Sequence, residues 1–219
     1  MQGYWLKHTK NSRCILFMAG WGMGPEPFAP LVGDDFDLFI CYDYRELSIP
    51  NMNIFSGYDR LELIAWSMGV WVAAGLFSGQ EKLFSRATAL GGTLQPVDDQ
   101  TGIPAAAFES TMETLNEAGL EVFYDSMFDL QAQSEQFMRN RPVRSVSSVR
   151  EELLSLKKAV QRTDPVPDIF SRRIVTMRDR IFPARNQLRA WGKTRAERMK
   201  WPHFPFYLKE CRSTLFPVA

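Results

Sequence analysis

The stretch LELIAWSMGVWVAAGLF, residues 61–77, passes from the pattern of a buried strand to that of a buried helix at one serine. Its first six residues form a short apolar run typical of a strand, and residues 68–77 are apolar on almost every side, as in a helix buried against a sheet. A serine on so tight a strand-to-helix turn needs small neighbours two positions before and after it. Around Ser67 these are Ala65, in place of the more usual glycine, and Gly69. The stretch therefore predicts a nucleophilic serine at the carboxyl end of a strand.

Other short apolar runs that end in glycine, aspartate or serine repeat this form along the chain. The predicted strands of this form are residues 13–19, 36–42, 61–66, 84–90 and 172–177. A short edge strand is predicted at 3–8 and another short strand near 198–201. Helical patterns at 184–191 and 205–215 follow the later strands. Strands of this kind predict an α/β fold, a mostly parallel sheet flanked by helices, with its loops collected at one edge.

Residues 98–163 differ in character from both flanks. They contain no strand-like run, and their apolar residues recur at helical spacing. Residues 98–138 carry nine acidic and no basic side chains, whereas residues 139–219 carry 19 basic and seven acidic ones. We therefore expect a core formed by residues 1–97 and 164–219, with a helical lid inserted at 98–163 that partly neutralises its own charge.

The composition excludes several classes of protein. With 219 residues, of which 45% are hydrophobic, and a net charge of +1, the chain suits one globular domain and not a disordered or collagen-like protein. No apolar run approaches the roughly 18 residues of a membrane helix. Cys14, Cys41 and Cys211 form no CxxC pair and favour the reducing cytoplasm. With only two histidines the chain offers no metal-ligand cluster, so we expect no metal and no other cofactor.

The two histidines limit the choice of a general base for Ser67. His8 lies in the first predicted strand and is expected at the surface, whereas His203 follows the last strand, where a loop can bring it over the sheet edge. Asp179 ends a predicted strand between the two, which gives the chain order Ser-Asp-His of α/β-hydrolases. Its carboxylate would hold the imidazole in the tautomer that accepts the serine proton. Asp43, which also ends a strand, is the rival acid.

An attacked carbonyl needs two backbone N–H donors where its negative charge develops. One is expected from Met68, directly after the serine, and the other from Trp21, which lies between two glycines after the second strand. The alternative for this glycine-rich segment is a simple tight turn. Phosphate binding is unsupported, because Gly20, Gly22 and Gly24 do not form GxGxxG and no lysine follows them as in a P-loop.

Several short motifs keep an order and spacing that span residues 13–206. They are AGWG at 19–22, YDY at 42–44, AWSMG at 65–69, FY and MF at 123–124 and 127–128, Asp179 with IFP at 181–183 and NQ at 186–187, and HFPF at 203–206. Together they resemble the BioG type of biotin-pathway esterase. The resemblance implies a compact α/β-hydrolase that cleaves the methyl ester of pimeloyl-[acyl-carrier protein]. It also implies that Ser67 is the nucleophile, Asp179 the acid and His203 the base, with oxyanion N–H groups from Trp21 and Met68.

Two groups of residues in the predicted lid are expected to meet this substrate. The basic residues expected to attract an acidic acyl-carrier protein are Arg139, Arg141 and Arg144. The aromatic residues expected to line the acyl channel are Phe123, Tyr124 and Phe128. For both groups a plainer alternative is open, because the charges can pair within the lid and the rings can be ordinary packing.

Two other functions stay open. The same fold and the same three residues serve other carboxylesterases and thioesterases, because a fold does not determine the substrate. In a different class, the basic last third of the chain, with Trp191 and Trp201, is a candidate nucleic-acid-binding surface. Its positive charges are scattered among strands and helices instead of gathered in a recognised module, which argues against this second alternative.

Overall fold

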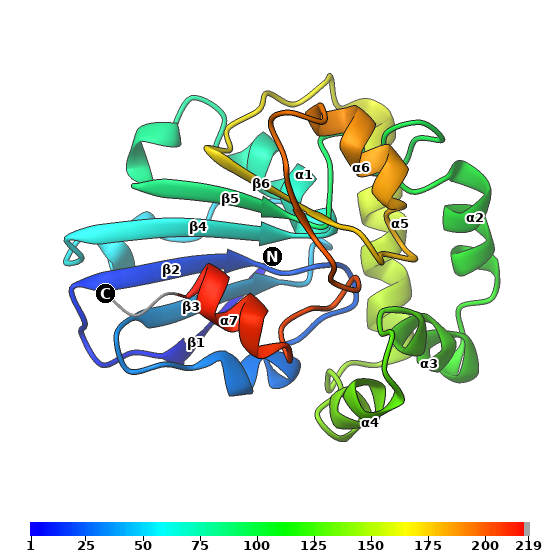
Figure 1. Ribbon diagram of the computed structural model, residues 1–219, viewed down its shortest axis with the longest axis horizontal. Helices are drawn as coiled ribbons and strands as arrows, with labels where there is room; N and C mark the ends of the chain where they lie inside the picture. Colours follow the sequence, from blue (N-terminus) through cyan, green and yellow to red (C-terminus); the bar gives the residue numbers. More distant parts are fainter. Residues whose placement is uncertain (217–219) are drawn as a thin grey trace.

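Seven strands form one sheet in the computed structural model, which describes residues 1–216 (Figure 1). The strands are β1 (Gln2–Lys7), β2 (Arg13–Met18), β3 (Asp37–Tyr42), β4 (Arg60–Trp66), β5 (Arg86–Leu90), β6 (Arg172–Thr176) and β7 (Glu197–Met199), in the order β1-β3-β2-β4-β5-β6-β7. Only β1, at one edge, runs antiparallel to its neighbour. The predicted mostly parallel α/β sheet is therefore confirmed.

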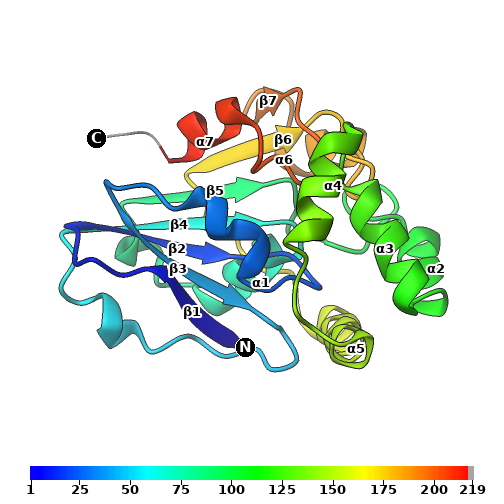
Figure 2. The ribbon, with the colours of Figure 1, turned by 90° about the horizontal axis from the view of Figure 1, so that it is seen from below.

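The central strands are apolar because the sheet is covered on both faces. Every residue of β2 is buried, as expected of a parallel strand with a helix on each side. The helix α1 (Met68–Leu76) lies on one face of the sheet and α7 (Lys209–Leu215) on the other (Figures 1 and 2). All parallel strands end at the same edge, so the loops that follow β2, β4, β5 and β6 meet there.

The predicted elements are found to within one or two residues, except at the last helix. The helix α6 (Ala184–Trp191) has the predicted bounds, but α7 begins at Lys209 and not at residue 205. Phe204 and Phe206 are the physical reason, because both are fully buried and pack edge-on against the ring of Trp66. Residues 205–208 instead form a turn that carries these rings into the core.

Four helices occupy the segment between β5 and β6. They are α2 (Ala105–Glu113), α3 (Glu117–Ser126), α4 (Gln131–Arg139) and α5 (Val146–Arg162), and they lie beyond the carboxyl ends of the strands (Figures 1 and 2). Ion pairs join the acidic and basic parts, such as Arg141 with Glu121 at 2.8 Å and Lys157 with Glu109 at 2.7 Å. The role of this segment as a lid stays a prediction.

The three cysteines are buried and their thiols are unreactive. Burial raises the pKa of the Cys14 and Cys41 thiols to about 12, and burial raises the pKa of Cys211 as well. A thiol with so high a pKa is a poor nucleophile. Within residues 1–216 no group of three or more histidine, cysteine, aspartate or glutamate side chains could hold a metal ion, and no helix there could span a membrane.

Replacing Asp37 by asparagine is expected to weaken the hydrogen bonds that hold the turn between β1 and β2. The buried Asp37 carboxylate accepts hydrogen bonds from residues 9–11 and from the Tyr58 hydroxyl, at 2.7–3.0 Å. Burial alone would raise its pKa, but these donors outweigh burial and lower the pKa to about 2. The Asp37→Asn variant should therefore reduce the free energy of unfolding at pH 7 by about 1–3 kcal/mol.

The same carboxylate predicts how the wild-type stability depends on pH. A lowered pKa in the folded state means that the stabilisation is present above pH 3.8 and is lost as the pH falls toward 2. In urea unfolding at several pH values, the free energy of unfolding should fall less steeply with decreasing pH for Asp37→Asn than for wild type. The control is Asp35→Asn, at an exposed neighbouring carboxylate. Equal curves for wild type and Asp37→Asn would contradict the prediction.

Candidate active site

Ser67 lies on a strained turn between β4 and α1. Its backbone has a φ of 58° and a ψ of −130°, a conformation that non-glycine residues rarely adopt. Glycines make room for this turn, since a Cβ at Gly69 would collide with the carbonyl oxygens of Met18 and Ala19. A Cβ at Gly92, after β5, would collide with the carbonyl of Ser67 itself. The small residue at position 69 is thus required by the close approach of α1 to the end of β2.

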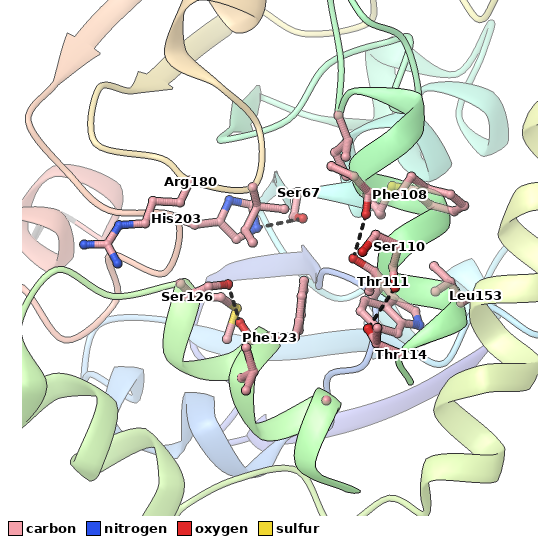
Figure 3. Close-up of a pocket in the computed structure, with 18 of the residues that line it drawn as sticks. Ser67, Phe108, Ser110, Thr111, Thr114, Phe123, Ser126, Leu153, Arg180 and His203 are labelled. Atoms are coloured by element: carbon pink, nitrogen blue, oxygen red, sulfur yellow. Dashed lines mark hydrogen bonds between the residues drawn. The ribbon is translucent and has the colours of Figure 1, made fainter. Parts of the chain in front are cut away.

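Ser67, His203 and Asp179 form a continuous chain of hydrogen-bonding groups. The Oγ of Ser67 lies 3.0 Å from Nε2 of His203 (Figure 3). Nδ1 of His203 lies 2.8 Å from Oδ2 of Asp179. All three residues are buried, at 5%, 1% and 8% exposure in that order. When the carboxylate of Asp179 accepts a hydrogen bond from Nδ1–H of His203, the lone pair on Nε2 is left to accept the proton of the serine hydroxyl.

The two competing residues lie elsewhere. His8 stacks on the ring of Trp5 near the edge strand β1, with ring centroids 4.2 Å apart. Asp43 follows β3 and pairs with Arg45 at 2.7 Å and with Arg144 at 3.2 Å. Neither residue reaches the serine, so the structure brings together the three residues that the chain order Ser-Asp-His predicts.

Five donors surround the carboxylate of Asp179. Its Oδ1 accepts the backbone N–H groups of Ile181 and Phe182, each at 2.8 Å. Its Oδ2 accepts the Thr176 hydroxyl at 2.7 Å and the Gln187 amide at 3.2 Å, in addition to His203. Sequence reasoning gave Thr176 no role. The available signal was a polar residue inside an otherwise apolar strand, next to the predicted acid.

Two aromatic rings hold the imidazole in place. The indole Nε1–H of Trp66 donates to the backbone carbonyl of His203 at 2.8 Å, and the two rings lie 5.1 Å apart. The ring of Phe182 lies nearly parallel to the imidazole, with a centroid distance of 6.0 Å. Sequence reasoning gave Trp66 no role either, although it lies directly before the serine. It joins the serine turn to the histidine loop.

The two predicted backbone donors border the same cavity as the serine. Met68 is the first residue of α1, and the first N–H groups of a helix have no acceptor within it. The Gly20-Trp21 segment passes close by, because a Cβ at Gly20 would lie 3.0 Å from the Cβ of Ser67. Both residues therefore lie close to Ser67, and the oxyanion role of their N–H groups stays a prediction.

A cavity of about 280 Å³ opens from Ser67 and His203 toward α2 and α3 (Figure 3). Its walls are mainly apolar, with Trp21, Ile103, Phe108, Phe123, Met127 and Leu153 among the lining residues. The hydroxyls of Thr111, Thr114 and Ser126 also border it, but each donates its hydrogen to a helix carbonyl. Among the described lining residues, Arg180 and His203 alone have side chains that can carry a positive charge, and none is a carboxylate.

The three aromatic residues predicted for the acyl channel have different environments. Phe123 lines the cavity and contacts the ring of Trp21 edge-on. The cavity lining does not include Tyr124 or Phe128. Tyr124 points to a different side of α3, where its hydroxyl donates to the carbonyl of Gly22. Phe128 packs in an aromatic cluster with Phe137 and Phe204. Tyr124 and Phe128 therefore fit the alternative of ordinary packing within the helical segment.

The three arginines predicted to attract a carrier protein also differ. Arg139 is exposed at the end of α4, and Arg141 is half exposed and pairs with Glu121. The structure corrects the prediction for Arg144, because its guanidinium is buried and binds Glu152 at 2.6 Å and Asp43 at 3.2 Å. A side chain paired in this way offers no charge to a partner. Arg144 lies in the loop between α4 and α5, so helical spacing could not predict its burial.

Comparison with known proteins gives this geometry a context. A family model described as "Pimeloyl-ACP methyl esterase BioG" matches residues 1–207. The crystal structure of BioG from Haemophilus influenzae is similar to this chain with a TM-score of 0.83 and 33% identity, over 94% of this chain and 95% of that one. A lipase-esterase related protein from Clostridium acetobutylicum has a TM-score of 0.69 at 12% identity and covers 100% and 99% of the two chains. That likeness shows the α/β-hydrolase fold alone.

One curated relative is longer than this chain. A malonyl-[acyl-carrier protein] O-methyltransferase from Bacteroides fragilis is 35% identical over 209 residues. The match covers 95% of this chain and 42% of that protein, so this chain spans less than half of the relative's length.

Proposed function

This chain belongs to the BioG family of pimeloyl-ACP methyl esterases, and from that membership we propose that it is a serine carboxylesterase acting on the methyl ester of pimeloyl-[acyl-carrier protein]. The observation that carries the proposal is the hydrogen-bonded series Ser67–His203–Asp179 at the end of an apolar cavity. In this proposal Ser67 is the nucleophile, His203 the general base and Asp179 the residue that orients the histidine.

The chemistry follows from the positions of these groups. As the Ser67 oxygen attacks the ester carbonyl carbon, its proton passes to Nε2 of His203. The carbonyl oxygen becomes negative and is stabilised by the N–H groups of Met68 and Trp21. Collapse of the tetrahedral intermediate breaks the bond to the methoxy group, which leaves as methanol with the proton from His203. Water, deprotonated by the same nitrogen, then hydrolyses the acyl-enzyme and frees the carboxylate.

The cavity supports an acyl chain that ends in an uncharged ester. Its mainly apolar walls suit the methylene groups of the acyl chain, and an uncharged ester needs no counter-charge there.

A carrier-bound substrate is supported by the comparisons and by surface charge. The name of the Bacteroides relative describes methyl transfer to malonyl-[acyl-carrier protein]. A methyl ester carried by an acyl-carrier protein is the kind of substrate from which a methyl esterase would remove the methyl group. In our proposal α2–α5 cover the site as a lid. Arg139 and Arg141, at its exposed turn after α4, would attract the acidic carrier.

The direct test is incubation of the purified protein with pimeloyl-[acyl-carrier protein] methyl ester, with mass spectrometry to detect loss of the methyl group. We expect conversion to the free acid with the thioester to the carrier left intact. Hydrolysis of the thioester instead would assign the protein to the thioesterases. Hydrolysis of small esters alone would retain a carboxylesterase and remove the carrier-bound substrate from the proposal.

Charge reversal is expected to separate carrier binding from catalysis. The double variant Arg139→Glu/Arg141→Glu should lower kcat/KM for the carrier-bound ester by about ten-fold, because like charges would face the carrier. Turnover of a small soluble methyl ester should be unchanged. The matched control is Lys82→Glu, an exposed lysine in the short helix Glu81–Leu83 that precedes β5 at the opposite edge of the sheet. An equal loss with both substrates would point to a disturbed lid, not to the loss of a docking surface.

A further inference from the structure

The segment that carries the predicted Trp21 donor is held by helices outside the sheet. The indole Nε1–H of Trp21 donates to the carbonyl of Val149 on α5 at 2.9 Å. The Tyr124 hydroxyl on α3 donates to the carbonyl of Gly22 at 2.9 Å. The N–H of Gly22 donates to Oε2 of Glu152 on α5 at 3.1 Å. Both polar backbone groups of Gly22 and the side chain of Trp21 are therefore bonded to α3 and α5.

The segment has little support of its own. Gly22 has a φ of +75°, in the left-handed region that favours glycine, and residues 19–24 form no strand or helix. Without its bonds to α3 and α5, the peptide between Trp21 and Gly22 would be free to turn. The direction of the Trp21 N–H would then change, because consecutive peptide planes are linked through the same backbone dihedrals.

Glu152 has no place in the ester chemistry, yet it is fully buried. Its Oε1 accepts the backbone N–H of Tyr44 at 2.9 Å, and its Oε2 accepts Gly22 and the Arg144 guanidinium at 2.6 Å. Burial raises its pKa, while Arg144 and the two backbone donors act in the opposite direction. A carboxylate is costly to bury without such partners. Here it connects α5 to the loops that follow β2 and β3.

We infer that α3 and α5 set the geometry of the oxyanion hole, with Tyr124 and Glu152 as positioning residues that fix the Gly22 peptide and, through it, the Trp21 N–H. The inference rests on the proposed function, since it assigns a cause to the placement of one proposed donor. The helices α3 and α5 belong to the catalytic scaffold, because moving them away from the sheet would break three buried hydrogen bonds to this segment.

The test uses the full-length protein and two conservative substitutions. Tyr124→Phe removes only the hydroxyl that holds the Gly22 carbonyl. In Glu152→Gln, an NH₂ group replaces one carboxylate oxygen and faces either the Gly22 or the Tyr44 N–H, so the two loops can no longer both be held. The matched controls are Tyr207→Phe, whose hydroxyl donates to the carbonyl of Pro27, and Glu151→Gln, at an exposed carboxylate that pairs with Arg45.

The main readout is the reaction of Ser67 with a p-nitrophenyl alkylphosphonate. The serine oxygen bonds to phosphorus, its proton passes to His203, and p-nitrophenolate leaves and is followed by its absorbance. The phosphoryl oxygen occupies the oxyanion hole, so the rate reports on its donors. We expect about a ten-fold lower rate for each of Tyr124→Phe and Glu152→Gln, because small misplacements of a donor are costly. The double variant should lose less than the product of the two factors, because both residues fix the same peptide. For the methyl ester, kcat should fall by similar factors with little change in KM.

The possible results separate the explanations. Wild-type phosphonylation rates in both variants, or an equal loss in Tyr207→Phe and Glu151→Gln, would overturn the inference. A lower melting temperature with unchanged kcat would mean that the contacts only stabilise the fold, and would also overturn it. Failure of the proposed substrate gives a different result, namely no turnover of the carrier-bound ester by wild type while Ser67 still reacts with the phosphonate. The variants then test the oxyanion geometry through that reaction alone.

Discussion

Replacing Ser67 by alanine is expected to lower kcat for the methyl ester on the order of 10⁴- to 10⁶-fold, the range seen when a serine hydrolase loses its nucleophile. The residual rate would come from the oxyanion hole and from substrate binding. The fold should persist, because alanine fits the buried site and is no more strained than serine at a φ of 58°. The rate is measured by release of methanol, and the fold by circular dichroism.

A matched control distinguishes the loss of a nucleophile from the loss of any buried hydroxyl. Ser134, on α4, is about as buried as Ser67 at 6% exposure, and it donates to the exposed carboxylate of Asp125. The variant Ser134→Ala should retain nearly full activity. Retention of activity in Ser67→Ala would refute the serine mechanism. Equal loss in both variants would indicate a general structural defect.

Replacing Asp179 by asparagine is expected to lower kcat by about 10⁴-fold with the structure preserved. The Oδ1 position accepts two backbone N–H groups, so the amide oxygen of asparagine will stay there. The amide NH₂ then takes the place of Oδ2 and donates toward Nδ1 of His203. A neutral imidazole that accepts at Nδ1 carries its proton on Nε2, and Nε2 can no longer accept the proton of Ser67.

This prediction is checked by kinetics together with a measurement of the histidine tautomer. Nitrogen NMR of labelled protein should show the proton on Nδ1 of His203 in wild type and on Nε2 in Asp179→Asn. The control is Asp168→Asn, at a carboxylate that also accepts a backbone N–H and pairs with Arg173, at the other end of β6. An unchanged tautomer with lost activity would mean that Asp179 acts in some other way.

The strands and the neighbourhood of the candidate site could be predicted from the sequence because the signals for both are local. A buried parallel strand is a short apolar run, and its end is marked by glycine, serine or aspartate. Ser67 and Asp179 each follow such a run, and His203 follows the short strand predicted near 198–201. Parallel strands end at one edge, so residues distant in the chain were expected to meet there, and the structure brings them within hydrogen-bond distance.

The sequence alone could not separate core from cavity within the helical segment. Helical spacing groups Phe123 and Tyr124 as aromatic neighbours, but consecutive residues on a helix point about 100° apart and face different surroundings. Only the packed structure shows that Phe123 borders the cavity and that Tyr124 reaches the Gly22 carbonyl. The late start of α7 has the same origin, because the burial of Phe206 in an aromatic cluster overrides the local helical pattern.

Charge was the least predictable property. In the sequence, Arg144 and Glu152 are two charges eight residues apart in a basic, helical stretch, and a solvated surface is the ordinary expectation for both. In the structure they pair at 2.6 Å in the interior and join α5 to the loops after β2 and β3. A sequence by itself determines where apolar runs begin and end. Which charges are buried depends on partners far along the chain, and those partners are chosen only when the helices pack against the sheet.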